Sequence, residues 1–216
     1  MIETAVLIFS GGDLTGWRKE YPSAPLKHLY VINPPGETIT ARLIRQCEDR
    51  GVVPTVVTNE PEIIEESKGR YYEPKMGIMS VQTLLSMKSF WKERTIVLHG
   101  DVIFGKVGMD QVFDWHEPYG SFGNFWETFA ISFRKSYWLM MEKLIMRTAE
   151  LADSLLQGGL GYMWNVFCKD DNRGPKEMDR PEFILIKDHS MDIDGPGYWK
   201  SFNIGVLDKG RLDDLP

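Results

Sequence analysis

Cysteine and long apolar segments are scarce in this sequence. Only two of its 216 residues are cysteine, Cys47 and Cys168, so it carries neither a disulfide framework nor a metal-ligand spacing. Its longest apolar runs, such as residues 5–9, fall far short of the about 20 residues that a membrane helix needs. The first residues include Glu3 and lack a basic start, which is untypical of a secretory signal. These absences predict a cytoplasmic protein that does not span a membrane.

Positive charge is also in deficit. The 25 Lys and Arg residues stand against 31 Asp and Glu residues, which gives a net charge of -6. A protein that coats nucleic acid needs clustered basic residues, so this balance disfavours that class but leaves room for a local basic nucleotide pocket. A hydrophobic content of 43% and a charged content of 26% argue against a largely disordered chain. The length predicts one domain over residues 1–216, with residues 208–216 as a solvated tail.

Strand and helix patterns alternate along the chain. Apolar or β-branched runs predict strands, and apolar residues at helical spacing predict helices. The predicted strands are residues 5–9, 52–57, 70–73, 95–98, 129–133 and 183–187. The predicted helices are residues 38–49, with Thr38 as a cap, 60–68, 78–91 and 134–157. Such alternation predicts a Rossmann-like α/β fold of three layers, α/β/α, around a mixed and mainly parallel sheet.

A glycine-rich loop follows the first predicted strand, at the end of a sheet where ligands bind in folds of this kind. Its small residues, which would let backbone N–H groups approach a phosphate, are Ser10, Gly11, Gly12 and Gly16. Arg18 offers a planar fork and Lys27 a point charge for a triphosphate. The loop matches no standard phosphate-binding motif, so a glycine turn beside two surface cations is an equal interpretation.

Carboxylates follow two further predicted elements. Gly100-Asp101 ends the strand at residues 95–98, and Asp101 could hold Mg²⁺ or simply cap the next turn. Asp192 and Asp194 alternate, so in extended backbone both point to one side and would repel each other without a cation between them. The alternative for this pair is that one residue caps the N-terminus of a helix and the other carboxylate has no specific role. The metal hypothesis is favoured because Asp101 offers a partner from another strand end.

These motifs, in this order, carry a resemblance that covers residues 5 to about 203. Ser-Gly-Gly, Gly16-x-Arg18, Pro25-x-Lys27, Gly100-Asp101 and Asp192-Ile-Asp194 are similar to the motifs of nucleotidyltransferases of the GT-A-like nucleotide-diphospho-sugar transferase superfamily. The resemblance implies that the loop binds an NTP, with Arg18 and Lys27 at its triphosphate. It also implies that residues 129–133 form an antiparallel strand.

The resemblance extends to the metal and the nucleobase. It implies that Asp101, Asp192 and Asp194 hold Mg²⁺, or Mn²⁺ as the alternative cation. Residues 74–80 resemble the segment that meets the nucleobase or sugar, which makes Gly77 and Ser80 candidate nucleotide contacts. The implied activity joins an NTP to a sugar phosphate or similar phosphorylated small molecule and releases pyrophosphate. Base, acceptor and oligomeric state stay open.

Two other functions are compatible with the same residues. A GT-A glycosyltransferase would use a nucleotide sugar and an Asp-x-Asp motif, and Asp192-Ile-Asp194 has these letters although it stands late in the chain. A nucleotide-binding or partner-binding protein with weakened catalysis is supported by the late motif, which reads Asp-Gly-Pro-Gly and lacks the family's Thr and Glu-Asp. The aromatic segment 119–126 could be an acceptor loop or a turn that covers the sheet.

Overall fold

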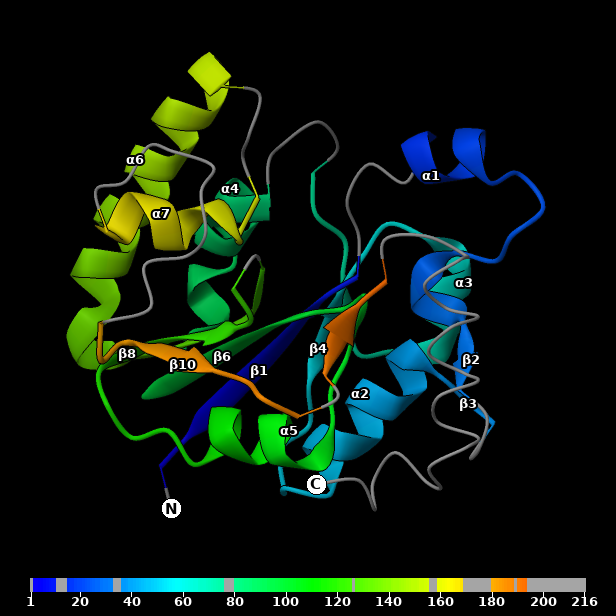
Figure 1. The fold of residues 1–216 in the computed structure, drawn as a ribbon, viewed down its shortest axis with the longest axis horizontal. Coiled ribbons are helices and arrows are strands. Elements are labelled where there is room, and N and C mark those ends of the chain that lie inside the picture. The colour runs from blue at the N-terminus through cyan, green and yellow to red at the C-terminus, as the bar shows by residue number, and fades with distance from the viewer. Residues whose placement is uncertain are drawn as a thin grey trace.

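The computed structural model describes residues 2–10, 15–32, 36–75, 80–125, 127–155, 159–168, 180–188 and 190–193. Within these ranges a seven-stranded sheet runs through the molecule in the order β10-β8-β9-β6-β1-β4-β5 (Figure 1). Its strands are β1 (Thr4–Phe9), β4 (Thr55–Val57), β5 (Tyr71–Tyr72), β6 (Arg94–His99), β8 (Tyr119–Gly123), β9 (Thr128–Arg134) and β10 (Phe183–Leu185).

The sheet is mixed and mainly parallel. The pairs β1–β4, β1–β6, β4–β5 and β8–β10 are parallel, whereas β9 runs antiparallel to both β6 and β8. This confirms the predicted antiparallel strand at residues 129–133. Two short ribbons complete the strands: β2 (Val31–Ile32) pairs with β3 (Glu37–Thr38), and β7 (Val102–Ile103) pairs with β11 (Met191–Asp192).

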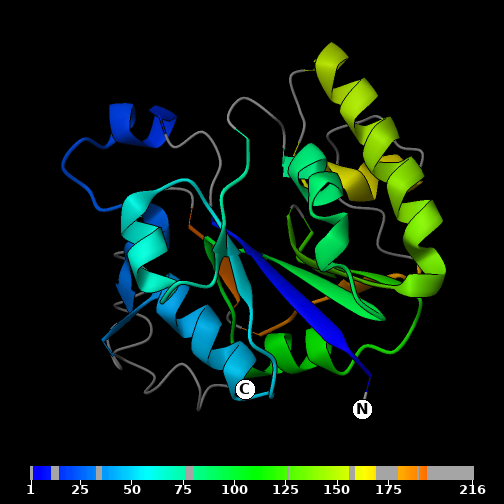
Figure 2. The ribbon, with the colours of Figure 1, turned by 180° about the vertical axis from the view of Figure 1, so that it is seen from behind.

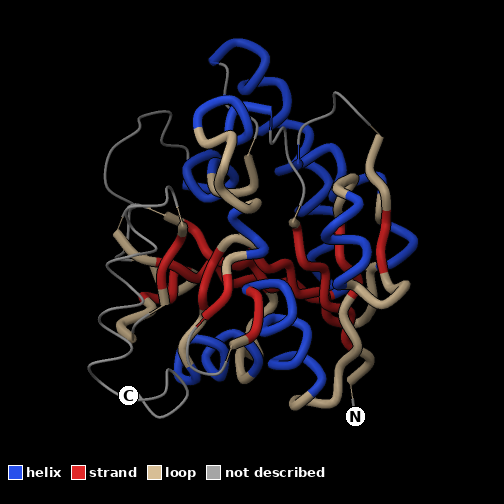
Figure 3. The backbone as a smooth tube through the Cα atoms, turned by 90° about the vertical axis from the view of Figure 1, so that its right-hand side faces the viewer, coloured by secondary structure: helices blue, strands red, loops and turns tan. Residues whose placement is uncertain are grey.

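Helices cover both faces of the sheet (Figure 3). The α-helices are α1 (Thr15–Glu20), α2 (Ile39–Glu48), α3 (Pro61–Glu66), α4 (Ser80–Ser86), α5 (Lys106–Phe113), α6 (Trp138–Leu155) and α7 (Tyr162–Cys168). The 3-10 turns are η1 (Lys27–Leu29), η2 (Lys88–Phe90) and η3 (Lys135–Tyr137). None of the helices in the described residues is long and apolar enough to cross a membrane.

The central strand β1 divides the apolar core into two layers. Val6 and Ile8 point into a cluster that includes apolar residues of α2 and α5, whereas Leu7 and Phe9 point into a cluster with α4, α6 and α7. Successive side chains of a strand face opposite sides, so a continuous apolar run is what a strand buried on both faces needs. Seen from behind, α4 and α6 lie on one side of β1 and α2 and α3 on the other (Figure 2).

The predicted helix at residues 38–49 forms α2 and begins as expected. The Thr38 side chain accepts a hydrogen bond from the backbone N–H of Ala41 at 3.0 Å, which satisfies one of the open donors of the first turn. The helix exit uses Gly51 at φ +75°, a left-handed conformation that favours glycine. Cys47 is fully buried on this helix, as its spacing from Ile39 and Leu43 indicates.

Two expectations need correction. Most of segment 119–126 is neither an acceptor loop nor a covering turn, since Tyr119–Gly123 forms the fully buried strand β8. The long helix begins at Trp138, because residues 135–137 form a 3-10 turn first. In each case pairing or packing with distant residues decided the local structure.

Candidate functional site

The carboxyl ends of β1 and β6 meet without a side chain between them. Phe9 lies beside His99 in the parallel register, and the Gly100 N–H donates to the Phe9 carbonyl at 2.9 Å. A Cβ on Gly100 would lie 2.0 Å from Ser10 Oγ and 2.8 Å from the Phe9 carbonyl oxygen. Glycine is therefore required before Asp101 because the neighbouring strand end fills the space of a side chain.

Ser10 is fixed where β1 ends. Its N–H donates to the Val57 carbonyl at 3.0 Å, and its carbonyl accepts from the Thr58 hydroxyl at 3.1 Å. The Ser10 hydroxyl is fully buried and has no hydrogen-bond partner among the described residues. Ser10 is the first residue of the predicted phosphate loop.

Lys27 lies at the same strand ends. Its neighbours Leu26 and His28 are both buried, so the backbone of η1 is anchored on either side of the lysine. The Lys27 ammonium contacts the Asp101 carboxylate, and the two side chains are 21% and 17% exposed. Two residues that the sequence proposed for different roles, phosphate binding and metal binding, are thus in direct contact.

The electrostatics of this contact involve a buried histidine. Burial lowers the pKa of His28 to about 4, against the opposing effect of the Asp101 charge, so its imidazole is neutral near pH 7. Burial alone would raise the pKa of Asp101, but the charges of Lys27, His28 and His99 and the hydrogen bond from Lys27 hold it below its ordinary value. Asp101 is therefore ionised at neutral pH.

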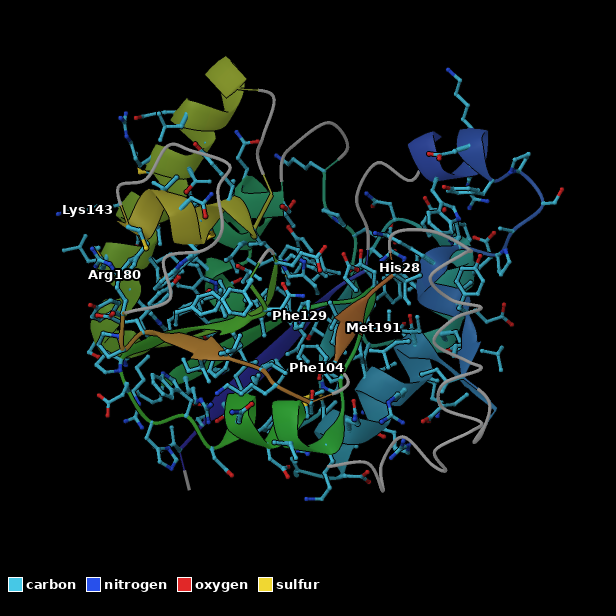
Figure 4. All side chains as sticks on the ribbon, viewed as in Figure 1. His28, Phe104, Phe129, Lys143, Arg180 and Met191 are labelled. Atoms are coloured by element: carbon cyan, nitrogen blue, oxygen red, sulfur yellow. The ribbon has the colours of Figure 1, made fainter. Side chains whose placement is uncertain are left out.

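The late acidic segment reaches Asp101 through the backbone. Asp192 lies opposite Val102 in the antiparallel β7–β11 pair, and the Ile193 N–H donates to the Asp101 carbonyl at 3.2 Å. The Asp192 carboxylate accepts from its neighbour, the Ile193 N–H, at 2.7 Å. In Figure 4, the label of Met191 lies beside β11 and the label of His28 lies close to it.

Two residues that the sequence did not single out hold the chain just after Asp101. The fully buried Arg42 donates from Nε and Nη2 to the Phe104 carbonyl at 3.4 and 3.2 Å, and Gln46 Nε2 donates to the same oxygen at 3.1 Å. Arg42 also contacts Glu37 at 3.3 Å. Both residues occupy i and i+4 of α2, a spacing that places them on one face but does not reveal their target.

Arg18 lies apart from this group of contacts. It is on α1, 49% exposed, and its Nη2 lies 2.7 Å from Glu60 Oε2 and 3.4 Å from Glu62 Oε1. The hydrogen bond that Arg18 donates to Glu60 is the main reason that the pKa of Arg18 is raised. The structure therefore gives Arg18 an acidic partner on α3 rather than a contact with Lys27 or Asp101.

The remaining predicted residues are distributed as follows. Gly16 lies within α1, and the Ser80 hydroxyl at the start of α4 accepts from the Leu160 N–H at 3.2 Å. Gly11, Gly12, Gly77 and Asp194 lie outside the described residues. Among the described residues, no three His, Cys, Asp or Glu side chains come together in a group that could hold a metal ion.

Known structures share this architecture. A candidate glucose-1-phosphate thymidylyltransferase from Bacillus anthracis aligns over 95% of this chain and 96% of its own, with 14% identity and a TM-score of 0.62. The inositol-1-phosphate CTP transferase from T. maritima aligns over 98% and 99%, with 11% identity and a TM-score of 0.59. A cytidylyltransferase from Leptospira borgpetersenii aligns over 100% and 91%, with 13% identity and a TM-score of 0.57.

No protein-family model and no curated protein sequence matches the chain. At these identities the likeness establishes the fold and leaves the activity to be argued from the site. The chain has the nucleotidyltransferase fold of the GT-A-like type: a mixed, mainly parallel seven-stranded sheet flanked by helices, as in sugar-phosphate nucleotidyltransferases.

Proposed function

We propose that the protein is a Mg²⁺-dependent nucleotidyltransferase of the cytoplasm, which joins an NTP to a sugar phosphate or similar phosphate acceptor and releases pyrophosphate. The observation that carries the proposal is the meeting of three segments far apart in sequence at one strand end. Lys27 contacts Asp101, and Ile193 of the late acidic segment bonds to the Asp101 carbonyl. Ligands bind at such carboxyl ends in open α/β sheets.

The donor set fits a hard divalent cation. Asp101 presents a carboxylate that already has a cation against it, the Lys27 ammonium, and Asp192 lies on the ribbon that pairs directly after Asp101. Carboxylate oxygens suit Mg²⁺, and Mn²⁺ as the alternative. We assign Asp101, Asp192 and, from the sequence resemblance, Asp194 as the ligands. A bound ion would supply positive charge that neutralises the phosphates.

In the proposed reaction, a phosphate oxygen of the acceptor attacks the α-phosphorus of the NTP. The bond between this phosphorus and the oxygen that bridges to the β-phosphate breaks, and pyrophosphate leaves with the electron pair. No side chain needs to remove a proton, because the attacking phosphate is already ionised. The protein supplies position and charge: Lys27 and Arg18 would stabilise the transferring and departing phosphates. Ser10, with Gly11, Gly12 and Gly16, would cradle the triphosphate, and Gly77 and Ser80 would meet the nucleoside.

The contact between Lys27 and Asp101 offsets the charge of a largely buried carboxylate. An ionised carboxylate that is only 17% exposed needs a partner, and the Lys27 ammonium supplies it. With a cation on Asp101, Lys27 would turn to the phosphates. The same lysine would then compete with the metal before nucleotide binding and support the nucleotide afterwards.

A nucleotide-binding protein with weakened catalysis is the second candidate. It is favoured by the ion pairs of Arg18 with Glu60 and Glu62. They engage a side chain that was predicted to bind phosphate with carboxylates at the start of α3. Such a protein would bind an NTP but form no nucleotide sugar.

Calorimetry with CTP, UTP, GTP and ATP, each with and without Mg²⁺, tests the proposal on wild type and Asp101→Asn. We expect one NTP to bind, more tightly with Mg²⁺, and the metal effect to disappear in the variant. Asp110→Asn is the matched control, because Asp110 is a carboxylate of α5 that pairs with Arg50 and Lys106 instead.

Turnover with a panel of sugar phosphates then separates the candidates. Release of pyrophosphate supports the transferase, and binding without release supports the second candidate. Binding of UDP or a nucleotide sugar in place of every NTP would favour a glycosyltransferase. An absence of all nucleotide binding by the folded wild type would contradict the proposal.

A further inference from the structure

The N-terminus of α5 donates hydrogen bonds to a distant part of the chain. Asp188 Oδ2 accepts from the Gly108 N–H at 2.6 Å, and Ser190 Oγ accepts from the Gly105 N–H at 2.9 Å. Asp188 Oδ1 accepts from the Ser190 N–H at 2.8 Å, which links the two acceptors to each other. Together these bonds form a cap supplied from about eighty residues away along the chain.

The helix lacks a side-chain cap of its own. The N-cap residue of α5 is Gly105, which has no side chain to accept a bond from the first turn. An ionised carboxylate at this end is also favoured by the helix dipole. Asp188 and Ser190 therefore supply what the local sequence of α5 omits.

The fit between the two segments is close on both sides. A Cβ on Gly105 would lie 2.4 Å from Asp188 Oδ2, and a Cβ on Gly108 would lie 2.7 Å from Ser190 Oγ. Glycine at these two positions leaves the space that the Asp188 and Ser190 side chains fill.

This cap lies one residue before the strand that carries Asp192. Ser190 is followed by β11, whose only two residue pairs are Met191 with Ile103 and Asp192 with Val102. A ribbon of this length is not stable by itself. It also carries the acidic Asp192, which lies opposite Val102, directly after Asp101.

The segment that receives β11 is fixed from its other side. Arg42 and Gln46 of α2 both donate to the Phe104 carbonyl, directly before the Gly105 N–H that Ser190 accepts. The chain that follows Asp101 is thus held by α2 through a carbonyl and by Asp188 and Ser190 through amides.

We propose that Asp188 and Ser190 are positioning residues: by capping α5 they hold β11 against β7 and thereby fix the late acidic segment beside the chain that follows Asp101. The metal part of this inference rests on the proposed function, whereas the attachment of β11 does not. Asp188 touches neither substrate nor metal in this scheme.

The first test measures hydrogen exchange of the backbone amides in the metal-free protein. Asp188→Asn keeps the shape but replaces one of two acceptors by an amide group that faces a donor. We expect the Ile193 amide, which bonds to Asp101, to exchange about tenfold faster or more. Amides of α6 should be unchanged. Asp110→Asn is the control, because it removes two ion pairs of the same helix without touching β11.

The second test measures Mn²⁺ binding by electron paramagnetic resonance with a non-hydrolysable NTP analogue present. Asp188→Asn should weaken Mn²⁺ binding by about tenfold, as loss of an outer partner of a metal site does. Affinity for the analogue without metal should stay within about twofold of wild type, because the variant does not touch Lys27, the proposed phosphate contact. Ser190→Ala removes only the hydrogen bond from the Gly105 N–H, and it replaces Asp188→Asn in both tests if that variant does not fold.

The outcomes separate this inference from the proposed function. If wild type binds neither Mn²⁺ nor the analogue, the proposed function fails, but faster exchange at Ile193 in Asp188→Asn still supports the attachment of β11. If exchange at Ile193 is unchanged in the folded variants, the inference is overturned. If exchange at Ile193 becomes faster but Mn²⁺ affinity does not change, the claim that Asp188 positions a metal ligand is overturned.

Discussion

The two cations that the sequence placed at the triphosphate have different surroundings. Lys27 is 21% exposed, lies between two buried neighbours, and contacts Asp101 at the strand ends. Arg18 is 49% exposed on a six-residue helix and contacts glutamates of α3. Exposed ion pairs contribute little to stability, whereas a partly buried pair is sensitive to loss of either partner. The comparison indicates that Lys27 is already held at the strand ends, whereas Arg18 would have to leave Glu60 to reach the proposed site.

The largest effect is expected from Lys27→Met. Turnover should fall by about a hundredfold or more, because a preorganised charge at the transferring phosphate is lost. Mn²⁺ affinity of the nucleotide-free protein should rise at the same time, since Asp101 loses its resident cation. Rapid-quench kinetics and Mn²⁺ titration measure the two effects. Equal losses in Lys27→Met and Arg18→Gln would remove the distinction between the two cations.

Stability in acid should depend on His28, which has no counterpart beside Arg18. The unfolded imidazole takes up a proton below about pH 6.5, whereas the folded one stays neutral until about pH 4. The unfolded state therefore binds more protons in this window, and stability falls as the pH drops, by up to about 3 kcal/mol. Asp101 raises the pKa of His28 and Lys27 lowers it, so these charges oppose each other.

Urea unfolding between pH 7 and pH 4.5 with EDTA present measures this dependence, and His28→Gln should flatten it. Asp101 does not contribute between these pH values. Its folded pKa lies below its unfolded pKa of about 3.9, so its stabilising effect is lost only when the pH falls from about 3.9 through the folded pKa. A wild-type curve that is flat across the window would show that His28 is not held neutral.

A smaller effect is expected from Arg18→Gln. Loss of one exposed phosphate contact should reduce nucleotide affinity by about tenfold, with thermal stability nearly unchanged. Calorimetry with the preferred NTP and a melting curve give the two values. If the variant loses stability but keeps its nucleotide affinity, Arg18 only stabilises the contact between α1 and α3 and does not bind the nucleotide.

The smallest effect is expected from Glu60→Gln, which weakens the hold of α3 on Arg18. Stability should change by less than about 1 kcal/mol, since the pair is exposed. Nucleotide affinity should rise slightly if Arg18 has to leave Glu60 to reach a phosphate. A fall in affinity would mean instead that Glu60 prepares Arg18 for its ligand.

Elements with a strong local pattern were predictable from the sequence. The apolar run of β1 and the cap of α2 at Thr38 needed no information from elsewhere in the chain. Strand β8 was missed because its glycines resemble a turn; Gly120 lies where a Cβ would meet Trp115 Nε1 at 2.5 Å, and Gly123 where it would meet the Glu127 carbonyl oxygen at 1.9 Å. Those requirements arise only when distant or looped segments pack together.

The candidate site likewise combines contacts that the sequence indicated with contacts that it did not. The order of motifs suggested that Lys27 and Asp101 serve one ligand, and the structure brings them into contact. The sequence did not indicate that His28 would be neutral and buried beside them, because a lone histidine carries no such signal. It also left out helix α5, whose cap comes from Asp188 and Ser190 rather than from its own first residues.

The cap of α5 by Asp188 has a consequence for the order in which the protein is built. On the ribosome α5 emerges well before its cap, so its N-terminus stays open while some eighty further residues are made. The central strands β1 and β6 can pair before that point, but the ribbon at Asp101 cannot. Completion of the site is therefore a late and non-local event in folding. Chains that stop before residue 188 would keep the central strands but lack the ribbon that completes the site.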